Sequence, residues 1–435
     1  MSIQRLRNWL FSGSSSRPRR ASAKTAGTRY RPALEVLEDR RVMSHFSVVG
    51  TTLYVTGTTG VDNFSFAPKG TGYLCNMDGE SYTVNPAVIH SIVVNGVGQP
   101  DDSAELTVGA GPASLVLSPG GGTLMGTNYK VTLKHTGCIQ VFGNASDSAT
   151  LNASSTTAGD VEASSTQCVL EGNGYWFDVY NFGKVTVVGH KGPDTASMYG
   201  DIGQQNIFVG TPTWSNLKGP GYSIVLEGLD NGQPSIGFNT VDIYSASTAD
   251  MAHISGESSN SDIFLGTSTL SKLSGIGYSL NIHNFSDVVA FNVGGGTADL
   301  NDSAGGASFT GGPGWGKFSY ANGATVEAYD FQVVVGHAAW GTHDSAHLYA
   351  DPNRVNTLFA STDGLWLFTT KAEVKLDMTP AGWGQIIATT TSAYTDQAYV
   401  ENGNPYEGLN IELAYLPYKL SLDGNWGGYA STWAP

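Results

Sequence analysis

Asp147-Ser148-Ala149 is one copy of a tripeptide that recurs along the chain. An Asp, one variable residue and an Ala stand at Asp102, Asp147, Asp194, Asp250, Asp344 and Asp396, which we call the anchor aspartates. Gly296-Thr297-Ala298 occupies the one gap in this series without its Asp. Successive copies are 45 to 56 residues apart, with about 46 as the usual interval. A repeat of this length predicts a repetitive architecture.

Apolar residues stand at fixed distances after these tripeptides. Phe182, Leu229, Phe285 and Phe331 each follow an anchor position by 35 residues. A block of constant length predicts that each strand lies in register on its equivalent, because an insertion within a strand would turn inward residues outward. Variation in length is then confined to loops. The longest variable link, residues 230–249, is therefore predicted to be a protruding loop.

The local hydrophobic pattern has a period of two residues. Val185-Thr186-Val187-Val188 is rich in β-branched residues, and Ala298-Asp299-Leu300 alternates apolar with polar side chains. Both patterns are typical of β-strands. Gly accounts for 56 residues and charged residues for 14% of the chain, which argues against a helical bundle. Aromatic residues make up 11%, which argues against intrinsic disorder of the whole chain.

These patterns predict an all-β protein, a parallel right-handed β-helix (solenoid) built from two-coil repeats of about 46 residues. We divide each repeat into two coils with three short strands each. Neighbouring anchor aspartates would then lie about 10 Å apart. The alternative is a β-propeller, whose blades have a similar length. We favour the solenoid because a propeller needs matching ends for closure and the two ends of this chain differ.

The chain divides into four parts by composition. Residues 1–44 carry a charge of +7 although the whole chain has −15, and they predict a disordered export or targeting arm. Residues 45–90 form an opening β segment, and residues 91–379 hold the solenoid repeats. Residues 380–435 are rich in Trp and Tyr and are expected to cap the open end of the solenoid. The alternative for this last part is an aromatic platform for sugar rings.

Residues 34–44 resemble the LEPR-XLL type of N-terminal segment, which occurs on many secreted bacterial repeat proteins. The matching positions are Leu37, Glu38, Arg40 and Ser44, and the departures are Asp39 and Val42-Met43. The resemblance implies export from a bacterial cell, so we expect the protein outside the cell or on its surface. The alternative is a short amphipathic helix that docks on the first strand.

Aligned aspartates raise the question of calcium. The candidate ligands are Asp102, Asp147, Asp194, Asp250 and Asp344. Residues 53–57, 60–64 and 92–96 loosely resemble hemolysin-type (RTX-like) repeats, which implies a calcium-binding protein as one alternative. True RTX repeats have a nine-residue period, whereas Gly-x-Asp occurs here only singly. We expect no cofactor, because an Asp at a turn commonly accepts hydrogen bonds from backbone amides.

Histidines near residue 340 are a weaker metal candidate. His337, His343 and His347 lie close in sequence to Asp344 and Asp351. A zinc site needs three or four converging ligands, and the sequence does not supply a closing one. We therefore expect solvated histidines.

The three cysteines are Cys75, Cys138 and Cys168. An odd number does not form a disulfide framework, so we expect buried thiols. A single Cys138–Cys168 bridge that leaves Cys75 free is the alternative.

The composition also limits the partners. A strongly acidic body after residue 44 disfavours nucleic acid, and the lack of an apolar run of about 18 residues predicts no membrane span. Low charge with many Ser, Thr and aromatic residues suits polar contacts. We expect a secreted or cell-surface structural or adhesive solenoid, without catalytic activity, that contacts carbohydrate or other cell-surface polymers. Its oligomeric state is not set by the sequence.

The main alternative is a carbohydrate-active β-helix enzyme, either a polysaccharide lyase or a hydrolase. Gly-x-Ser-x-Gly, HExxH and P-loop motifs do not occur in the sequence. Such an enzyme would show Asp or Glu side chains converging with Lys or Arg in a groove on one face of the solenoid.

Overall fold

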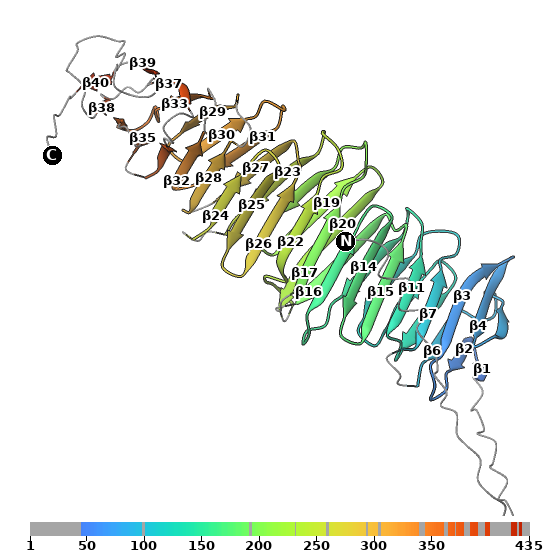
Figure 1. Cartoon of the computed structure of the whole chain (residues 1–435). Coiled ribbons are helices and arrows are strands. Elements are labelled where there is room, and N and C mark those ends of the chain that lie inside the picture. The colour runs from blue at the N-terminus through green and yellow to red at the C-terminus, as the bar shows by residue number, and fades with distance from the viewer. Residues whose placement is uncertain are drawn as a thin grey trace, which may run out of the picture. The chain divides into compact units, whose positions relative to one another are not determined.

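A computed structural model of the chain describes residues 45–97, 101–190, 194–230, 232–257, 261–292, 295–302, 306–338, 344–360, 364–369, 371–377, 383–389, 396–400, 419–423 and 426–428. The regular elements of these residues are β-strands that stack side by side (Figure 1). The predicted arm at 1–44, its LEPR-XLL-like segment and much of the predicted cap lie outside the described residues. The described part of the chain holds no helix that could cross a membrane.

The strands form two sheets. Sheet A contains β1 (His45–Val49), β2 (Thr52–Thr56), β6 (Ser91–Asn95), β8 (Ser114–Ser118), β9 (Gly121–Met125), β10 (Lys130–Lys134), β12 (Ser148–Asn152), β16 (Lys184–His190), β18 (Ile207–Gly210), β19 (Trp214–Gly219), β20 (Tyr222–Asp230), β21 (Gln233–Pro234), β23 (Met251–Ser255), β27 (Asp287–Phe291), β29 (Ser308–Gly312), β30 (Trp315–Ser319), β31 (Thr325–Tyr329), β33 (Asp344–Tyr349), β37 (Trp383–Thr389) and β39 (Lys419–Asp423).

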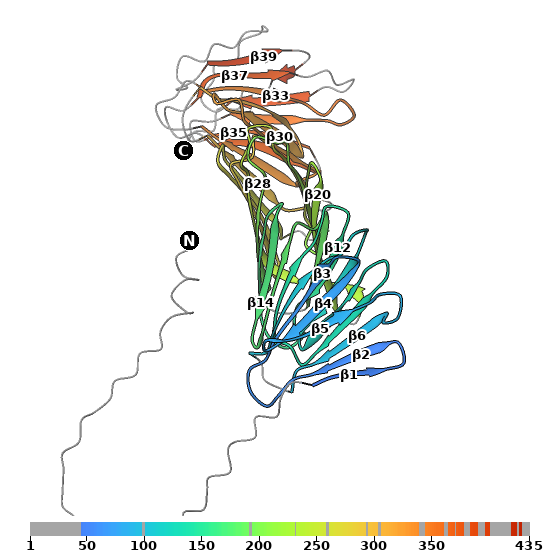
Figure 2. The same cartoon turned by 90° about the vertical axis from the view of Figure 1, so that its right-hand side faces the viewer.

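Sheet B contains β3 (Asn63–Lys69), β4 (Gly72–Met77), β5 (Glu80–Val84), β7 (Ser103–Thr107), β11 (Cys138–Phe142), β13 (Gly159–Ala163), β14 (Gln167–Gly172), β15 (Tyr175–Tyr180), β17 (Asp194–Tyr199), β22 (Phe238–Tyr244), β24 (Ile263–Gly266), β25 (Leu270–Gly275), β26 (Tyr278–His283), β28 (Thr297–Asn301), β32 (Val333–His337), β34 (Thr357–Ala360), β35 (Gly364–Phe368), β36 (Glu373–Asp377), β38 (Asp396–Val400) and β40 (Trp426–Gly428). Figure 2 shows β14 and β28 of sheet B on one side of the stack and β12 and β20 of sheet A on the other.

The chain passes back and forth between the sheets and lays successive strands in parallel register. In sheet A, β12 pairs in parallel with both β8 and β16, so that Ala149 stands between Leu115 and Val185. Equivalent apolar residues therefore stack directly above one another, as a solenoid requires. The β-solenoid predicted from the repeats is confirmed.

A repeat contains five strands, and the longer repeat at 194–249 adds the short β21 as a sixth, whereas two coils of three strands each were predicted. An antiparallel meander, such as β13–β14–β15 in sheet B, is followed by one strand in sheet A, β16, and one in sheet B, β17. The next repeat places its meander, β18–β19–β20, in sheet A. Since one repeat winds one and a half turns, alternate repeats start in alternate sheets.

This half turn separates neighbouring anchor aspartates. Asp147 lies where the chain passes from sheet B to sheet A, which we call the B-to-A edge, and Asp194 lies at the opposite, A-to-B edge. Asp147 and Asp250 share an edge but are five strands apart, which corresponds to about 24 Å. The spacing of about 10 Å expected between neighbouring anchors is therefore wrong, because meanders occupy the intervening positions.

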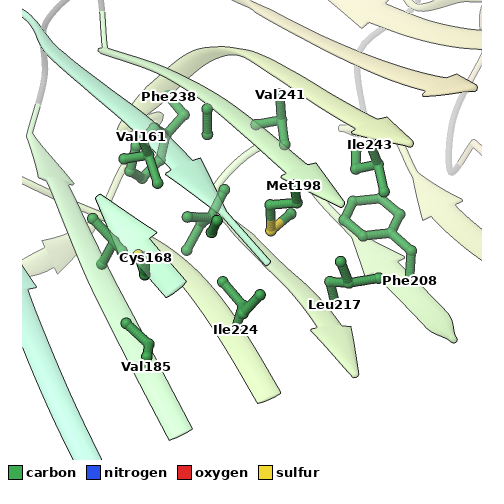
Figure 3. Packing of buried hydrophobic residues seen from close by; sticks show 14 of the residues in the cluster. Val161, Cys168, Val185, Met198, Phe208, Leu217, Ile224, Phe238, Val241 and Ile243 are labelled. Atoms are coloured by element: carbon green, nitrogen blue, oxygen red, sulfur yellow. The ribbon is translucent and has the colours of Figure 1, made fainter. Parts of the chain in front are cut away.

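The core lies between the two sheets. Figure 3 shows Val161, Met198 and Ile243 of sheet B together with Leu217 and Ile224 of sheet A. All five side chains are buried. Burial of a side chain of this size contributes about 1.5 to 3 kcal/mol, and the alternation of buried and outward residues explains the period of two in the sequence.

Tyrosines fix the meanders. In Gly172-Asn173-Gly174-Tyr175, a two-residue turn joins β14 to β15, and Gly174 has a φ of 80°. The ring of Tyr175 occupies the space where a side chain at Gly172 would lie. Its hydroxyl accepts a hydrogen bond of 3.1 Å from the backbone amide of Ser154. Tyr175 therefore ties the meander to the loop before it.

The prediction that residues 230–249 form one protruding loop is wrong. Residues 238–244 form β22, which pairs in parallel with β17 and β26 in sheet B. Phe238 is the structural equivalent of Phe182. Phe182 stands two residues before Lys184, which pairs with Ser148, and Phe238 stands two residues before Thr240, which pairs with Thr195; Ser148 and Thr195 each directly follow an anchor aspartate. Leu229 follows its anchor by the same 35 residues but is not the equivalent residue. The inserted residues instead lengthen β20 and form a hairpin with β21.

The opening segment and the end of the chain use the same sheets. β2 pairs in parallel with β6, and β3 pairs in parallel with β7, so residues 45–90 continue directly into the repeats. Beyond residue 380, β37 pairs with β39, and β38 pairs with β40, again in parallel.

Candidate functional site

Five of the six anchor aspartates are buried structural residues, and the side chain of Asp396 lies outside the described part of the chain. Asp102, Asp147, Asp194, Asp250 and Asp344 expose at most 2% of their surface. The carboxylate of Asp147 accepts hydrogen bonds from the backbone amides of Ala113 at 2.8 Å and Asn144 at 2.7 Å. One amide belongs to the turn before Asp147 and the other precedes β8, the neighbouring strand. The expected bonding of Asp to backbone amides is confirmed at this position.

The other anchors repeat this arrangement. Asp194 accepts a hydrogen bond of 2.5 Å from the amide of Gly159 and one of 3.1 Å from the amide of His190. Burial raises the pKa of Asp194, although both amides act in the opposite direction. The described residues contain no group of three or more His, Cys, Asp or Glu side chains placed to hold a metal ion. Calcium binding by these five aspartates stays an untested alternative.

The histidine candidates lie apart in the fold. His337 is in β32 of sheet B and His347 is in β33 of sheet A, while His343 lies outside the described residues. His337 is 3.7 Å from the carboxylate of Asp299, and His347 contacts the hydroxyl of Thr389 at 2.8 Å. His337 and His347, the two described histidines of this group, are therefore not brought together.

All three cysteines are free thiols, so the Cys138–Cys168 bridge is not formed. Cys75 and Cys168 are fully buried, and burial raises the pKa of each to about 12. Cys138 differs, because it is half-buried on the outer face of sheet B and lines a shallow groove of about 540 Å³ with Trp176 and Glu105.

A larger groove lies at the A-to-B edge and is the strongest candidate for a functional site. It has a volume of about 860 Å³. Its lining includes Trp315, Tyr329, Gln332, Asp351, Arg354 and Lys371. The two aromatic residues come from β30 and β31, and the other four come from connections at the same edge. Antiparallel pairing of β30 with β31 places Trp315 opposite Tyr329.

Charges of both signs surround this groove. Arg354 Nε lies 3.1 Å from Asp351 Oδ2, and Asp330 and Lys371 add one further charge of each sign. Asp330 has a φ of 62°, which turns the chain sharply after Tyr329. The groove therefore combines aromatic and other apolar surface with charges that nearly balance, although the protein as a whole is acidic.

Hydrogen bonds hold Tyr329 in place on sheet A. Its hydroxyl donates to Glu327 Oε2 at 2.5 Å, and Lys317 Nζ lies 2.5 Å from Glu327 Oε1. Burial alone would raise the pKa of Glu327, but the bonds from Lys317 and Tyr329 outweigh it and leave this pKa below its usual value. Burial and the Glu327 carboxylate raise the pKa of Tyr329 to about 12. This tyrosine therefore stays neutral and fixed.

Sequence reasoning missed this groove. Trp315 and Tyr329 have no motif around them, and Arg354 and Lys371 read as scattered basic residues. The aromatic pair becomes visible only when β30 is known to run antiparallel to β31. The one available signal is Gly312-Pro313-Gly314-Trp315, which resembles the hairpin sequence Gly172-Asn173-Gly174-Tyr175 with Trp in place of Tyr.

Comparison of the chain with protein-family models, with curated proteins and with solved structures finds no match.

Proposed function

We propose that this protein is a bacterial β-solenoid that acts outside the cell or on its surface, in a structural or adhesive role without catalytic activity, and that it contacts carbohydrate. The observation that supports carbohydrate contact most is the groove in which Trp315 and Tyr329 face polar and charged side chains. Sugar rings have apolar faces that pack on aromatic rings, and their hydroxyls form hydrogen bonds with amide and charged groups.

The proposed location rests on the resemblance of residues 34–44 to LEPR-XLL segments. Fractionation of the producing bacterium, followed by immunoblotting, tests it directly. We expect the protein in the medium or at the cell surface. A cytoplasmic protein would overturn this part of the proposal and leave the binding part to be judged by itself.

Binding is tested with the purified full-length chain on a glycan array. We expect retention on at least one class of polysaccharide and loss of that retention in Trp315→Ala. Trp214→Ala is the matched control, because Trp214 is an exposed tryptophan of sheet A outside the groove. Equal binding by both variants would show that the groove is not the binding site, and no binding to any glycan would reject carbohydrate contact.

A polysaccharide lyase or hydrolase is the second candidate, and one observation favours it. Asp330 and Asp351 share the groove with Arg354 and Lys371, which is the convergence of acidic and basic side chains that such an enzyme needs. The ion pair between Asp351 and Arg354 instead supports a binding site, since it satisfies the carboxylate. Release of reducing or unsaturated sugars from a panel of polysaccharides, abolished by Asp330→Asn, would establish this second function.

A further inference from the structure

A row of aromatic residues extends the groove along sheet A. Phe291 is opposite Tyr329 in the pairing of β27 with β31, and Tyr329 is opposite Trp315 in the pairing of β31 with β30. Trp315 is opposite Gly312 of β29, which in turn neighbours Tyr349 of β33. Phe291, Tyr329, Trp315 and Tyr349, which we call the aromatic row, therefore lie on one line across the strands.

The rings of this row are nearly parallel and evenly spaced. Ring centroids are 5.6 Å apart between Phe291 and Tyr329, 6.5 Å between Tyr329 and Trp315, and 6.3 Å between Trp315 and Tyr349. The interplanar angles are 22°, 10° and 21°. Parallel rings at these distances are offset from one another rather than fully overlapped. At the end of the row, Tyr349 also stacks on His347 of its own strand, with ring centroids 4.2 Å apart.

Gly312 makes the row continuous. It occupies the strand position between Trp315 and Tyr349, and a Cβ at Gly312 would lie 2.7 Å from Trp315 Nε1. The indole therefore covers the space that a side chain at 312 would fill, and it reaches Tyr349 beyond. From β27 to β33 the row crosses four strand intervals, or about 19 Å.

We propose that the aromatic row binds an extended neutral glycan chain whose long axis is parallel to the solenoid axis, with successive sugar rings on successive side chains. This inference rests on the carbohydrate contact proposed above. The spacing of the rings is comparable with the length of one pyranose unit in an extended chain. The balanced charges of Asp330, Asp351, Arg354 and Lys371 favour a neutral sugar over a polyanion.

A second aromatic row on sheet B provides a contrast. Tyr199, Tyr244 and His283 stack with centroid distances of 5.0 and 4.5 Å and interplanar angles of 11°. These ring centroids are closer together than those of the aromatic row on sheet A, and His283 Nε2 lies 3.3 Å from Asp242 Oδ1. None of these three residues lines the large groove at the A-to-B edge. Tyr199 is therefore a suitable control position.

The test measures the affinity of the full-length chain for cello- and chito-oligosaccharides of one to six units by isothermal titration calorimetry. We expect affinity to rise with chain length over the first several units and then to level off, because a longer chain projects beyond the row. Phe291→Ala and Tyr349→Ala, at the two ends of the row, should each weaken binding of the hexamer about five- to tenfold. Binding of the dimer should change less than about twofold, and Tyr199→Ala should change neither.

The outcomes separate this inference from the proposed function. Affinity that does not depend on chain length, or that is insensitive to both Phe291→Ala and Tyr349→Ala, would overturn the axial arrangement and leave binding in the groove intact. If neither oligosaccharide series binds but another glycan is retained on the array, the proposal that the ligand is a neutral extended glycan is wrong, and the proposed carbohydrate contact still stands. Circular dichroism of each variant shows whether a loss of binding reflects unfolding.

Discussion

The backbone amide of Asp62 donates a hydrogen bond of 3.0 Å to Oδ1 of Asp102, although 40 residues separate the two in sequence. The same bond recurs at other anchors, from Asn206 to Asp250 at 2.7 Å and from Ala307 to Asp344 at 3.0 Å. Each carboxylate thus satisfies a backbone amide of the neighbouring turn that has no strand partner. The recurring Asp is explained by this role between successive turns of the solenoid.

Replacement of Asp147 by Ala is expected to lower the free energy of unfolding by about 2 to 5 kcal/mol, because it leaves the amides of Ala113 and Asn144 without their acceptor. Guanidinium denaturation followed by circular dichroism measures this change. Asp160→Ala is the control, because Asp160 is exposed and bonds only to the Thr195 hydroxyl. Its effect should stay within about 0.5 kcal/mol. Equal effects of the two substitutions would contradict a structural role for the anchor.

The ring of Tyr175 leaves no room for a side chain at Gly172. Gly172→Ala should destabilise the fold by about 1 to 3 kcal/mol, because the new methyl group would overlap the ring of Tyr175. Gly60→Ala is a matched control, since its nearest atom would be Thr58 Oγ1 at 3.4 Å and its backbone is compatible with Ala. Thermal unfolding of both variants measures the difference, and a Gly172→Ala protein as stable as Gly60→Ala would refute this packing argument.

The repeats allowed the solenoid to be predicted because a stack of turns in register leaves equivalent residues at fixed intervals. The meanders were missed because an antiparallel strand and a parallel strand share the same alternation of side chains. The spacing of 35 residues makes Leu229 look like the equivalent of Phe182. The insertion that follows Leu229 is revealed only by the pairing of β22 with β17. This false equivalence placed a predicted loop on residues that form a strand.

The candidate site was less accessible to sequence reasoning than the fold. Asp147 could be recognised as structural from the sequence, since an Asp before a strand commonly accepts hydrogen bonds from backbone amides, and the amide of Ala113 makes this bond. The groove, by contrast, brings together Trp315 and Lys371 from different repeats, and their proximity depends on the length of each connection. Such lengths are not encoded in any local pattern.

Calcium should have no effect on stability if the anchor carboxylates are fully used by backbone amides. A titration with calcium, or its removal with EDTA, is then expected to leave the melting temperature unchanged, because a ligand that binds the folded state would raise it. Differential scanning fluorimetry measures this. A calcium-dependent rise that disappears in Asp194→Asn would support the RTX-like alternative, in which the five aspartates bind the ion.

The three thiols should differ in reactivity. In the folded protein near pH 8, Cys138 is expected to react with Ellman's reagent while Cys75 and Cys168 do not, because Cys138 is only half-buried and the other two are fully buried, with pKa values raised to about 12. Partial burial and Asp101 also raise the pKa of Cys138, so its reaction should be slower than that of an unhindered thiol. All three should react in guanidinium. Cys138→Ser should remove the fast reaction, and a second fast thiol in that variant would contradict the buried positions of Cys75 and Cys168.

Asp178 should make stability depend on pH in a direction opposite to that of a carboxylate whose pKa is lowered in the folded protein. This residue is buried on sheet B, and burial raises its pKa even though Tyr180 and Gln167 donate hydrogen bonds to it at 2.5 and 2.9 Å. Because the folded pKa exceeds the unfolded value of about 3.9, the folded chain retains a proton that the unfolded chain has released. The contribution of Asp178 therefore falls as pH rises from the unfolded pKa to the folded one, and is constant above that.

Asp178→Asn isolates this contribution, because the amide does not titrate and the other carboxylates are unchanged. Relative to the parent protein, the variant should gain stability as the pH rises from about 4 towards neutrality. Guanidinium unfolding of both proteins at a series of pH values measures the difference. Asp160→Asn, at an exposed carboxylate of the same sheet, provides the control. A difference between parent and Asp178→Asn that stays constant, or falls, over this range would contradict a raised pKa for Asp178.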